Sequence, residues 1–176
     1  MKRLICLISI CLAIPMVSRA QDASNPLTAT VRKTFDEYSK NVIGAAEAMP
    51  PEKYSYRPSA DVRTFGATIA HVAEVNYLVC GKLLTVPAPQ AQKAGEADPK
   101  DKLVGALKAS MDYCTQAFSK ITDANLAEMV PFFGGKQITR LGVAEAVSDD
   151  LVDHYAGLSI YLRMNGLLPP TANRKM

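Results

Sequence analysis

The sequence predicts an all-α protein, and within that class a four-helix bundle. Four long segments repeat their apolar residues at the spacing of an α-helix, and segments rich in proline, glycine and polar residues separate them. Aromatic residues make up only 7% of the chain and tryptophan is absent, whereas a β-sandwich or barrel would need more aromatic and β-branched residues. With 176 residues, 48% of them hydrophobic, the chain can build one core but is too short for two.

The first helix is predicted over residues 26–49. Asn25 precedes Pro26, and asparagine is a good N-cap while proline is tolerated in the first helical turn. Pro50 and Pro51 end the helix, since proline cannot continue it. Its apolar face is formed by Leu27, Val31, Phe35, Tyr38, Val42 and Ala45.

The second helix is predicted to follow a loop of residues 51–63. Thr64 can cap its N-terminus, and the helical pattern continues to Leu84. Its apolar face is formed by Phe65, Ile69, Val72, Val75, Val79 and Leu83. Residues 86–99 contain three prolines and are predicted to form a crossover on the surface.

The third helix is predicted to begin at Asp98 or Asp101. Its apolar face is formed by Leu103, Leu107, Met111, Cys114 and Phe118. A connection over residues 122–138 follows this helix. The Phe132-Phe133-Gly134-Gly135 run within it is either a flexible lip over a pocket or a tucked hydrophobic turn.

The fourth helix is predicted over residues 139–165, with Thr139 at its start and Gly166 just past its end. Four amphipathic helices of this length are expected to pack as a bundle. Very short connections would make each helix run opposite to the one before it. The connection over residues 86–99 is long enough for a crossover that leaves the second and third helices parallel.

The first twenty residues have the plan of a secretory signal peptide. Lys2 and Arg3 precede an apolar stretch, and small residues stand at the −3 and −1 positions before Gln21. An uncleaved N-terminal anchor is the alternative, although the apolar stretch is short for a membrane span. The sequence therefore predicts a signal peptide over residues 1–20, a mature domain over residues 21–176 and a periplasmic or secreted location.

The charge balance argues against a nucleic-acid-binding protein. Lys2, Arg3 and Arg19 lie in the predicted signal peptide, and the rest of the chain carries 17 basic and 17 acidic residues. A nucleic-acid binder would normally carry a basic surface. No later segment reaches the length of about eighteen apolar residues that a membrane span needs, so no membrane partner is expected after signal cleavage.

Two cysteines, Cys80 and Cys114, remain once Cys6 and Cys11 leave with the signal peptide. An oxidising compartment permits a disulfide between them. Cysteines in helical patterns are also common as small buried hydrophobic residues. The sequence leaves both alternatives open because it does not show the separation of the two Cα atoms.

The candidate metal ligands are His71, Asp150 and His154. Asp150 and His154 lie four residues apart within the apolar face of the fourth helix, so they stack one turn apart and point the same way. His71 lies at the edge of the apolar face of the second helix. Two imidazoles and one carboxylate can hold zinc, nickel or ferrous iron with one open position. The alternative is that Asp150 and His154 pair with each other and with a buried water.

Three neighbouring residues each allow a functional and a structural interpretation. Glu74 can accept the second ring N–H of His71 or can lie exposed on the polar side of its helix. Tyr155 can orient a group near the site or pack in the core. Arg163 can form a salt bridge near the site or face solvent at the helix end.

Two segments of the chain resemble the DinB-like superfamily of bacterial four-helix bundles. They are residues 54–77, which contain the run T-F-G-x-x-x-A-H-V, and residues 153–170, which read H-Y-x-x-x-x-x-Y-L-R-M-N-G-x-x-P-P from the second position. The resemblance covers nearly the whole mature chain. It implies an up-down-down-up bundle whose members often dimerise, so a homodimer is expected. It also implies a divalent metal held by three histidines, one on the second helix and an H-x-x-x-H pair on the fourth.

Within this resemblance, His71 corresponds to the ligand on the second helix and His154 to the second histidine of the pair. The first histidine of the pair would fall at residue 150, which is Asp150 in this chain. The change allows two interpretations. The carboxylate completes a site of two histidines and one carboxylate, or the site is lost and its remaining residues are structural.

Characterised members of the superfamily include thiol-dependent transferases and isomerases, in which the metal lowers the pKa of a low-molecular-weight thiol such as mycothiol or bacillithiol. The hypothesis that follows is an exported metal-binding bundle that acts on a small molecule as a hydrolase or a thiol-type transferase. One alternative is a non-enzymatic binding or structural bundle with a degenerate metal site. Another is a cytosolic thiol transferase whose N-terminus is not a signal peptide, since such thiols are cytosolic reagents.

Overall fold

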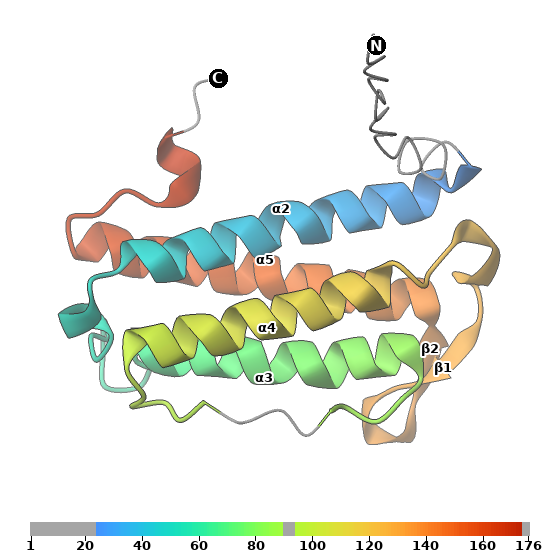
Figure 1. Ribbon diagram of the computed structural model, residues 1–176, viewed down its shortest axis with the longest axis horizontal. Helices are drawn as coiled ribbons and strands as arrows, with labels where there is room; N and C mark the ends of the chain where they lie inside the picture. Colours follow the sequence, from blue (N-terminus) through green and yellow to red (C-terminus); the bar gives the residue numbers. More distant parts are fainter. Residues whose placement is uncertain (1–23, 90–93, 174–176) are drawn as a thin grey trace, which may run out of the picture.

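The computed structural model describes residues 24–89 and 94–173 and confirms the all-α four-helix bundle (Figure 1). The four long helices are α2 (Pro26–Ala48), α3 (Phe65–Leu84), α4 (Lys100–Phe118) and α5 (Arg140–Met164). α2 and α5 run in one direction along the bundle, and α3 and α4 run in the other, which is the expected up-down-down-up order. The predicted signal peptide lies outside the described residues. None of the described helices is long and apolar enough to cross a membrane.

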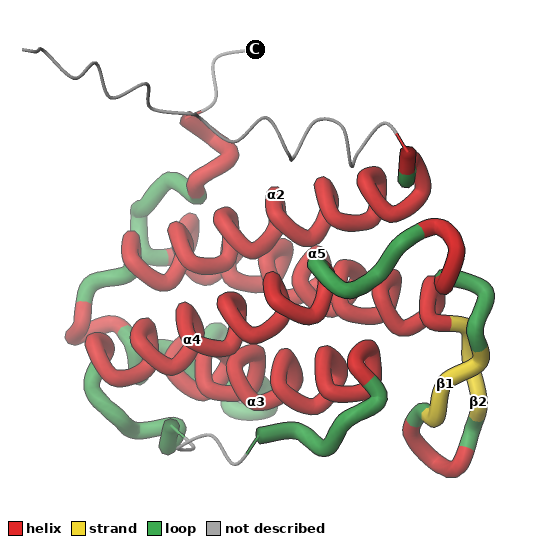
Figure 2. Tube along the Cα trace, turned by 45° about the vertical axis from the view of Figure 1, so that its right-hand side comes forward, coloured by secondary structure: helices red, strands yellow, loops and turns green. Residues whose placement is uncertain are grey.

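The packing of the helices determines which of them can share a site. α3 packs most extensively on α4, α2 packs on α5, and α3 also contacts α5 directly. Figure 2 shows the four helices from a second direction, with a small β-hairpin at one end of the bundle. Because α3 and α5 are in contact, side chains from both helices can meet between them.

The core is apolar along its whole length. Phe35 of α2 stacks on Phe118 of α4, with the ring centroids 4.4 Å apart. Burial of a large apolar side chain contributes roughly 1.5–3 kcal/mol, so these residues dominate the stability of the bundle. The largest fully buried side chains are Phe35, Phe65, Phe118, Met49, Ile69, Leu83, Leu103, Leu107, Ile121, Leu151, Leu158 and Leu162.

Three of the predicted helix ends are confirmed. The Thr64 side chain accepts a hydrogen bond from the backbone N–H of Ala67 at the start of α3. The Thr139 side chain accepts one from Gly142 at the start of α5. Gly166 adopts a φ of 74° just past the end of α5, a conformation that favours glycine.

Two other helix starts differ from the prediction. Asn25 occupies the N-cap position of α2, but its side chain makes no cap hydrogen bond. The cap comes instead from Asp123, whose carboxylate accepts hydrogen bonds from the N–H groups of Leu27 and Thr28. α4 begins at Lys100 after Pro99, without a side-chain cap, so the prediction of an aspartate at this start was wrong.

The connection between α4 and α5 contains a β-hairpin that the sequence pattern did not predict. Strands β1 (Met129–Pro131) and β2 (Gln137–Thr139) pair antiparallel, with Val130 opposite Ile138. Gly134 and Gly135 turn the chain with φ angles of 65° and 73°. Short 3₁₀ helices complete the fold: η1 (Pro51–Lys53), η2 (Asp123–Asn125), η3 (Phe133–Gly135) and η4 (Pro170–Asn173).

The Phe132-Phe133 segment is not a lip over the candidate metal ligands. Phe132 is half-buried, and the exposed ring of Phe133 lies 5.4 Å from Nζ of Lys82 near the end of α3. Lys82 is about three helical turns beyond His71. The hairpin therefore packs at the far end of the bundle from that residue.

Cys80 of α3 and Cys114 of α4 form a disulfide, which decides between the two alternatives left by the sequence. Their Cα atoms are 5.3 Å apart, within the range that a disulfide requires. Both residues are fully buried. Asn76 is buried beside them and donates a hydrogen bond to Ser110 at 2.9 Å. The bond therefore joins the two parallel helices inside the core.

Candidate functional site

The structure brings His71 and His154 together between α3 and α5. His71 lies two turns after the Thr64 cap of α3, and His154 lies near the middle of α5. The centroids of the two imidazole rings are 5.2 Å apart, with an angle of 76° between the ring planes. Two histidines that are 83 positions apart in the sequence therefore share one site.

Asp150 lies one turn before His154 and faces it. Its Oδ1 atom is 3.5 Å from Nε2 of His154, a distance longer than a normal hydrogen bond of about 2.7–3.2 Å. The other oxygen, Oδ2, is buried and has no hydrogen-bond partner among the described residues. A buried carboxylate oxygen is stabilised by a partner, and either a water molecule or a cation would provide one at this position.

The electrostatic environment keeps His71 uncharged at neutral pH. Burial, the Arg63 guanidinium and the His154 imidazole all lower the pKa of His71 below its usual value. Asp150 and Glu74 act in the opposite direction but do not outweigh them. A neutral imidazole carries a free lone pair and is the form of histidine that binds metals.

The donor chemistry fits a divalent metal, whereas the side-chain positions do not yet form a ligand cluster. Imidazole nitrogens and a carboxylate oxygen are ligands for zinc, nickel and ferrous iron. Within residues 24–89 and 94–173, however, no group of three or more His, Cys, Asp or Glu side chains is close enough to hold an ion together.

The three neighbouring residues discussed above adopt the structural alternative rather than the functional one. Glu74 is exposed on α3. The buried Tyr155 makes a 2.7 Å hydrogen bond with the hydroxyl of Thr171. Arg163 is exposed at the end of α5, with its Nη1 atom 3.5 Å from the carbonyl of Ser159.

Arg63, which the sequence pattern did not identify, acts electrostatically on His71, and Tyr161 of α5 is hydrogen-bonded to it. Tyr161 lies on the same face of α5 as His154, and its hydroxyl donates to the backbone carbonyl of Arg63 at 2.7 Å. Arg63 precedes the cap of α3 and lies in a loop without periodicity. The feature of the sequence that could have pointed to Arg63 is its position directly before the cap residue Thr64, eight positions before His71.

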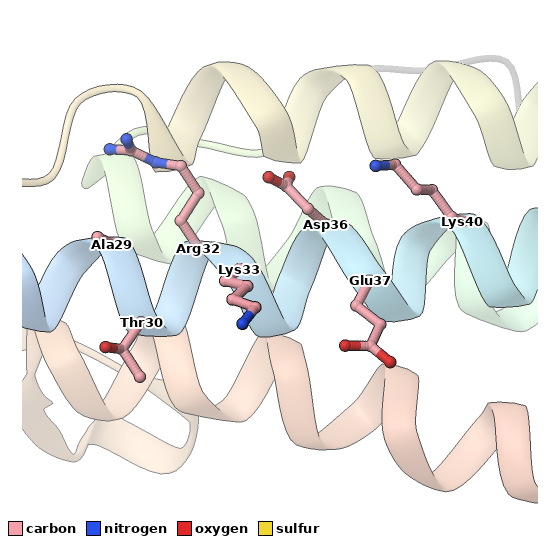
Figure 3. Close-up of a pocket in the computed structure, with 7 residues that line it drawn as sticks. All are labelled: Ala29, Thr30, Arg32, Lys33, Asp36, Glu37 and Lys40. Carbon is pink, nitrogen blue, oxygen red and sulfur yellow. The ribbon is translucent and has the colours of Figure 1, made fainter. Parts of the chain in front are cut away.

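A shallow hollow runs along α2. Figure 3 shows Arg32, Asp36 and Lys40 pointing toward α4, while Lys33 and Glu37 point toward α5. All of these side chains come from one helix and alternate in charge at a spacing of four residues. Such spacing is typical of a solvated helix face.

The fold and the site define a class of protein: an up-down-down-up four-helix bundle with imidazole and carboxylate side chains between its second and fourth long helices. The family comparison agrees with this class. The DinB superfamily matches residues 34–157, and the chain belongs to that superfamily. No curated protein matches the chain by sequence.

Solved structures share the fold at low sequence identity. A DinB-like protein from Bacillus subtilis is 16% identical with a TM-score of 0.68, and the match covers 84% of this chain and 99% of that one. A DinB-like protein from Bacillus cereus is 12% identical with a TM-score of 0.68, covering 81% and 95%. A mycothiol-dependent maleylpyruvate isomerase is 15% identical with a TM-score of 0.59, covering 76% of this chain but only 59% of the isomerase.

Proposed function

We propose that this protein is an exported DinB-superfamily bundle that binds a divalent metal ion through His71, Asp150 and His154 and acts on a small molecule. The observation that carries the proposal is the buried Oδ2 atom of Asp150, which has no hydrogen-bond partner among the described residues and lies beside two imidazoles. A divalent cation would satisfy that oxygen and use the lone pairs of both rings.

Each of the three residues would have a defined role. His71 supplies a neutral nitrogen from α3, because its environment disfavours the imidazolium form. His154 and Asp150 supply a nitrogen and an oxygen from adjacent turns of α5, and Asp150 also offsets the charge of the cation. The bound metal would supply Lewis acidity, which lowers the pKa of a water or thiol in the open position.

The reaction class follows from that chemistry. Activation of water leads to hydrolysis, and activation of a thiol leads to thiol transfer. A structure named as a mycothiol-dependent isomerase shares the fold, which supports the thiol-type reaction.

The buried disulfide supports export, because disulfides persist in oxidising compartments. An exported enzyme would lack cytosolic thiols, which favours hydrolysis.

The first test is elemental analysis of the protein purified without chelators or a histidine tag. We expect about one zinc, nickel or iron per chain in the wild type and almost none in His154→Ala. Asp153→Ala is the matched control, since Asp153 is exposed at the position directly before His154 and should leave the metal content unchanged. Circular dichroism would verify that each variant is folded.

A second measurement links the metal to stability. A ligand at one hundred times its dissociation constant stabilises the folded state by about 2.7 kcal/mol. Thermal unfolding of the wild type should therefore shift to lower temperature when a chelator is added, and His154→Ala should show no such shift. An unchanged metal content in His154→Ala would refute the assignment of this ligand.

A non-enzymatic binding or structural bundle is the second candidate function. It is favoured by the absence of a closed ligand cluster among the described residues and by the aspartate at a position where the superfamily resemblance implies a histidine. It predicts no stoichiometric metal in the wild type, even after incubation with each of the three ions. It also predicts that the chelator does not change thermal unfolding.

A further inference from the structure

The β-hairpin projects from one end of the bundle. Its turn lies beyond α3 on the side away from α2, as both views of the chain show (Figures 1 and 2). Val130 is buried and its partner Ile138 is half-buried, so this pair faces the bundle. Successive residues of a strand point to opposite faces, and Met129 and Pro131 are accordingly exposed. The hairpin is therefore attached by one face and presents the other to its surroundings.

The exposed part of the hairpin is unusually apolar. Residues 129–139 contain no acidic residue and one basic residue. Met129 is 58% exposed, and Phe133, at the turn, is 44% exposed. The ring of the half-buried Phe132 packs against Phe133, with the ring centroids 4.7 Å apart. Large apolar side chains that gather on one exposed feature, rather than lie scattered, indicate an interaction site.

The unpaired charges beside the turn are positive. Nζ of Lys82 lies 5.4 Å from the centre of the Phe133 ring, and the exposed Lys136 follows the turn. Neither lysine forms an ion pair within the described part of the chain. The carboxylate of Glu128, next to β1, is already paired with Arg140 at 2.8 Å. The apolar tip is thus flanked by two cationic side chains.

The shape of the tip selects the kind of partner. Gly134 and Gly135 turn the chain directly after Phe133, and a Cβ atom built on either glycine would meet nothing within 4 Å. A projecting tip does not offer the concave surface on which a small molecule or a peptide binds. The surface of a lipid bilayer can receive an apolar tip, while lysine side chains beside it reach anionic headgroups.

The position of the hairpin in the chain favours the same partner. α2 begins at Pro26, at the end of the bundle where the hairpin lies (Figure 1). The predicted signal peptide precedes α2 by a few residues, and a signal peptide is inserted in the membrane during export. Export therefore presents this end of the bundle, and with it the hairpin, to the bilayer.

We propose that the hairpin tip docks this protein on the surface of an anionic lipid bilayer, with the Phe133 ring at the interface and Lys82 and Lys136 on the headgroups. The inference goes beyond the proposed function and needs neither the metal nor a substrate. The expectation of no membrane partner was drawn from the lack of a spanning segment, and peripheral contact does not need one.

The absence of tryptophan from the chain allows a clean fluorescence test. Phe133→Trp places a single reporter at the tip, and Leu168→Trp places one past the end of α5, where Leu168 is 62% exposed. The full chain would be expressed with export, and intact mass would establish the N-terminus of the purified protein. Each variant would be titrated with vesicles of equal parts phosphatidylglycerol and phosphatidylethanolamine, and separately with vesicles of phosphatidylcholine alone.

We expect the emission of Phe133→Trp to move to shorter wavelength and to saturate with the anionic vesicles, while that of Leu168→Trp stays unchanged. In co-sedimentation, Phe133→Ser and Lys136→Glu should each weaken binding about tenfold. The matched controls Leu168→Ser and Lys53→Glu change exposed residues at the opposite end of the bundle and should bind as the wild type does. Circular dichroism would verify that each variant is folded.

Four results would overturn the inference: equal binding of Phe133→Ser and wild type, equal affinity for anionic and phosphatidylcholine vesicles, equal emission shifts in the two tryptophan variants, or no binding to either vesicle. The last result would favour a protein partner for the hairpin. His154→Ala should bind vesicles as the wild type does, so failure of the proposed metal site would leave this result unchanged.

Discussion

Asp150 and Arg63 set the electrostatics of the site in opposite directions. The first acts to raise the pKa of His71, and the second acts to lower it. Because burial and Arg63 prevail, the imidazole stays neutral over the range in which an exposed histidine would begin to take up a proton. These two residues therefore modify the protonation of His71 in addition to the effect of its burial.

Replacement of Arg63 by glutamine should raise the pKa of His71. The guanidinium disfavours the nearby imidazolium, and glutamine removes that charge while retaining a similar side-chain length. NMR titration of the two histidines in metal-free protein would measure the change. Arg57→Gln should leave the titration of His71 as it is in the wild type, and an unchanged value in Arg63→Gln would show that Arg63 is too distant to act on this ring.

The lowered pKa of His71 also makes the free energy of unfolding depend on pH. His71 binds its proton less readily in the folded chain than in the unfolded chain, whose histidine has a pKa of about 6.5. The free energy of unfolding of metal-free protein should therefore fall as the pH is lowered through this value. In Arg63→Gln the fall should be shallower, which denaturant titrations at several pH values would show.

The ends of the helices depend partly on distant residues. The first turn of α2 receives its cap from Asp123, which is 95 positions beyond Thr28. Burial acts to raise the pKa of the Asp123 carboxyl, but the hydrogen bonds from Thr28 and Leu27 outweigh it and hold the pKa below its usual value. α2 is thus fastened at its start to the connection that follows α4.

Asp123→Ala should lower the unfolding temperature of the bundle. The substitution removes the acceptor for two N–H groups of α2 and leaves them without their cap. Because the pKa of Asp123 is lowered in the folded state, the stability that it contributes should be lost as the pH falls below about 3.8. Thermal unfolding followed by circular dichroism would measure both effects, with the exposed Asp61→Ala as control.

The disulfide between α3 and α4 should contribute substantially to stability. It closes a loop of 34 positions, and the chain-entropy model for such a loop gives about 3–4 kcal/mol. The double variant Cys80→Ala/Cys114→Ala should lose about this amount in a denaturant titration. A reducing agent should destabilise the wild type in the same way and leave the double variant unaffected. Insensitivity of the wild type to reduction would contradict the prediction.

At the scale of the whole molecule, the distribution of charge separates the N-terminal segment from the bundle. Three basic residues and no acidic ones lie in residues 1–20, and the rest of the chain is balanced at 17 of each sign. Two of the four cysteines lie in the same segment, and the other two are paired within the core. Removal of this segment would leave a neutral chain without a free thiol.

Export therefore predicts a defined mature product. When the full chain is expressed in a bacterial host, we expect the periplasmic protein to begin at Gln21 and to contain Cys80 and Cys114 in oxidised form. Intact-mass analysis and thiol titration would check both properties. Recovery of uncleaved protein with reactive thiols from the cytoplasm would instead favour the cytosolic alternative.

The sequence alone determined the bundle and the ends of most helices. Apolar residues at helical spacing identify the faces that must be buried, and local caps such as Thr64 and Thr139 act within a few residues of their own positions. The spacing of Asp150 and His154 is local in the same sense, because residues four apart on a helix always share a face. Periodicity and capping are properties of short segments, so they can be predicted from the sequence without knowledge of the tertiary structure.

Only the tertiary structure decided which distant residues meet. The 5.3 Å between the Cα atoms of Cys80 and Cys114, the cap that Asp123 provides to α2, and the meeting of the His71 and His154 rings all depend on how the helices pack. The strands of the hairpin, three residues each, are too short to show a pattern of their own. The disulfide, the cap and the paired imidazoles arise from side chains that are far apart in the sequence, and packing of the helices brings them together.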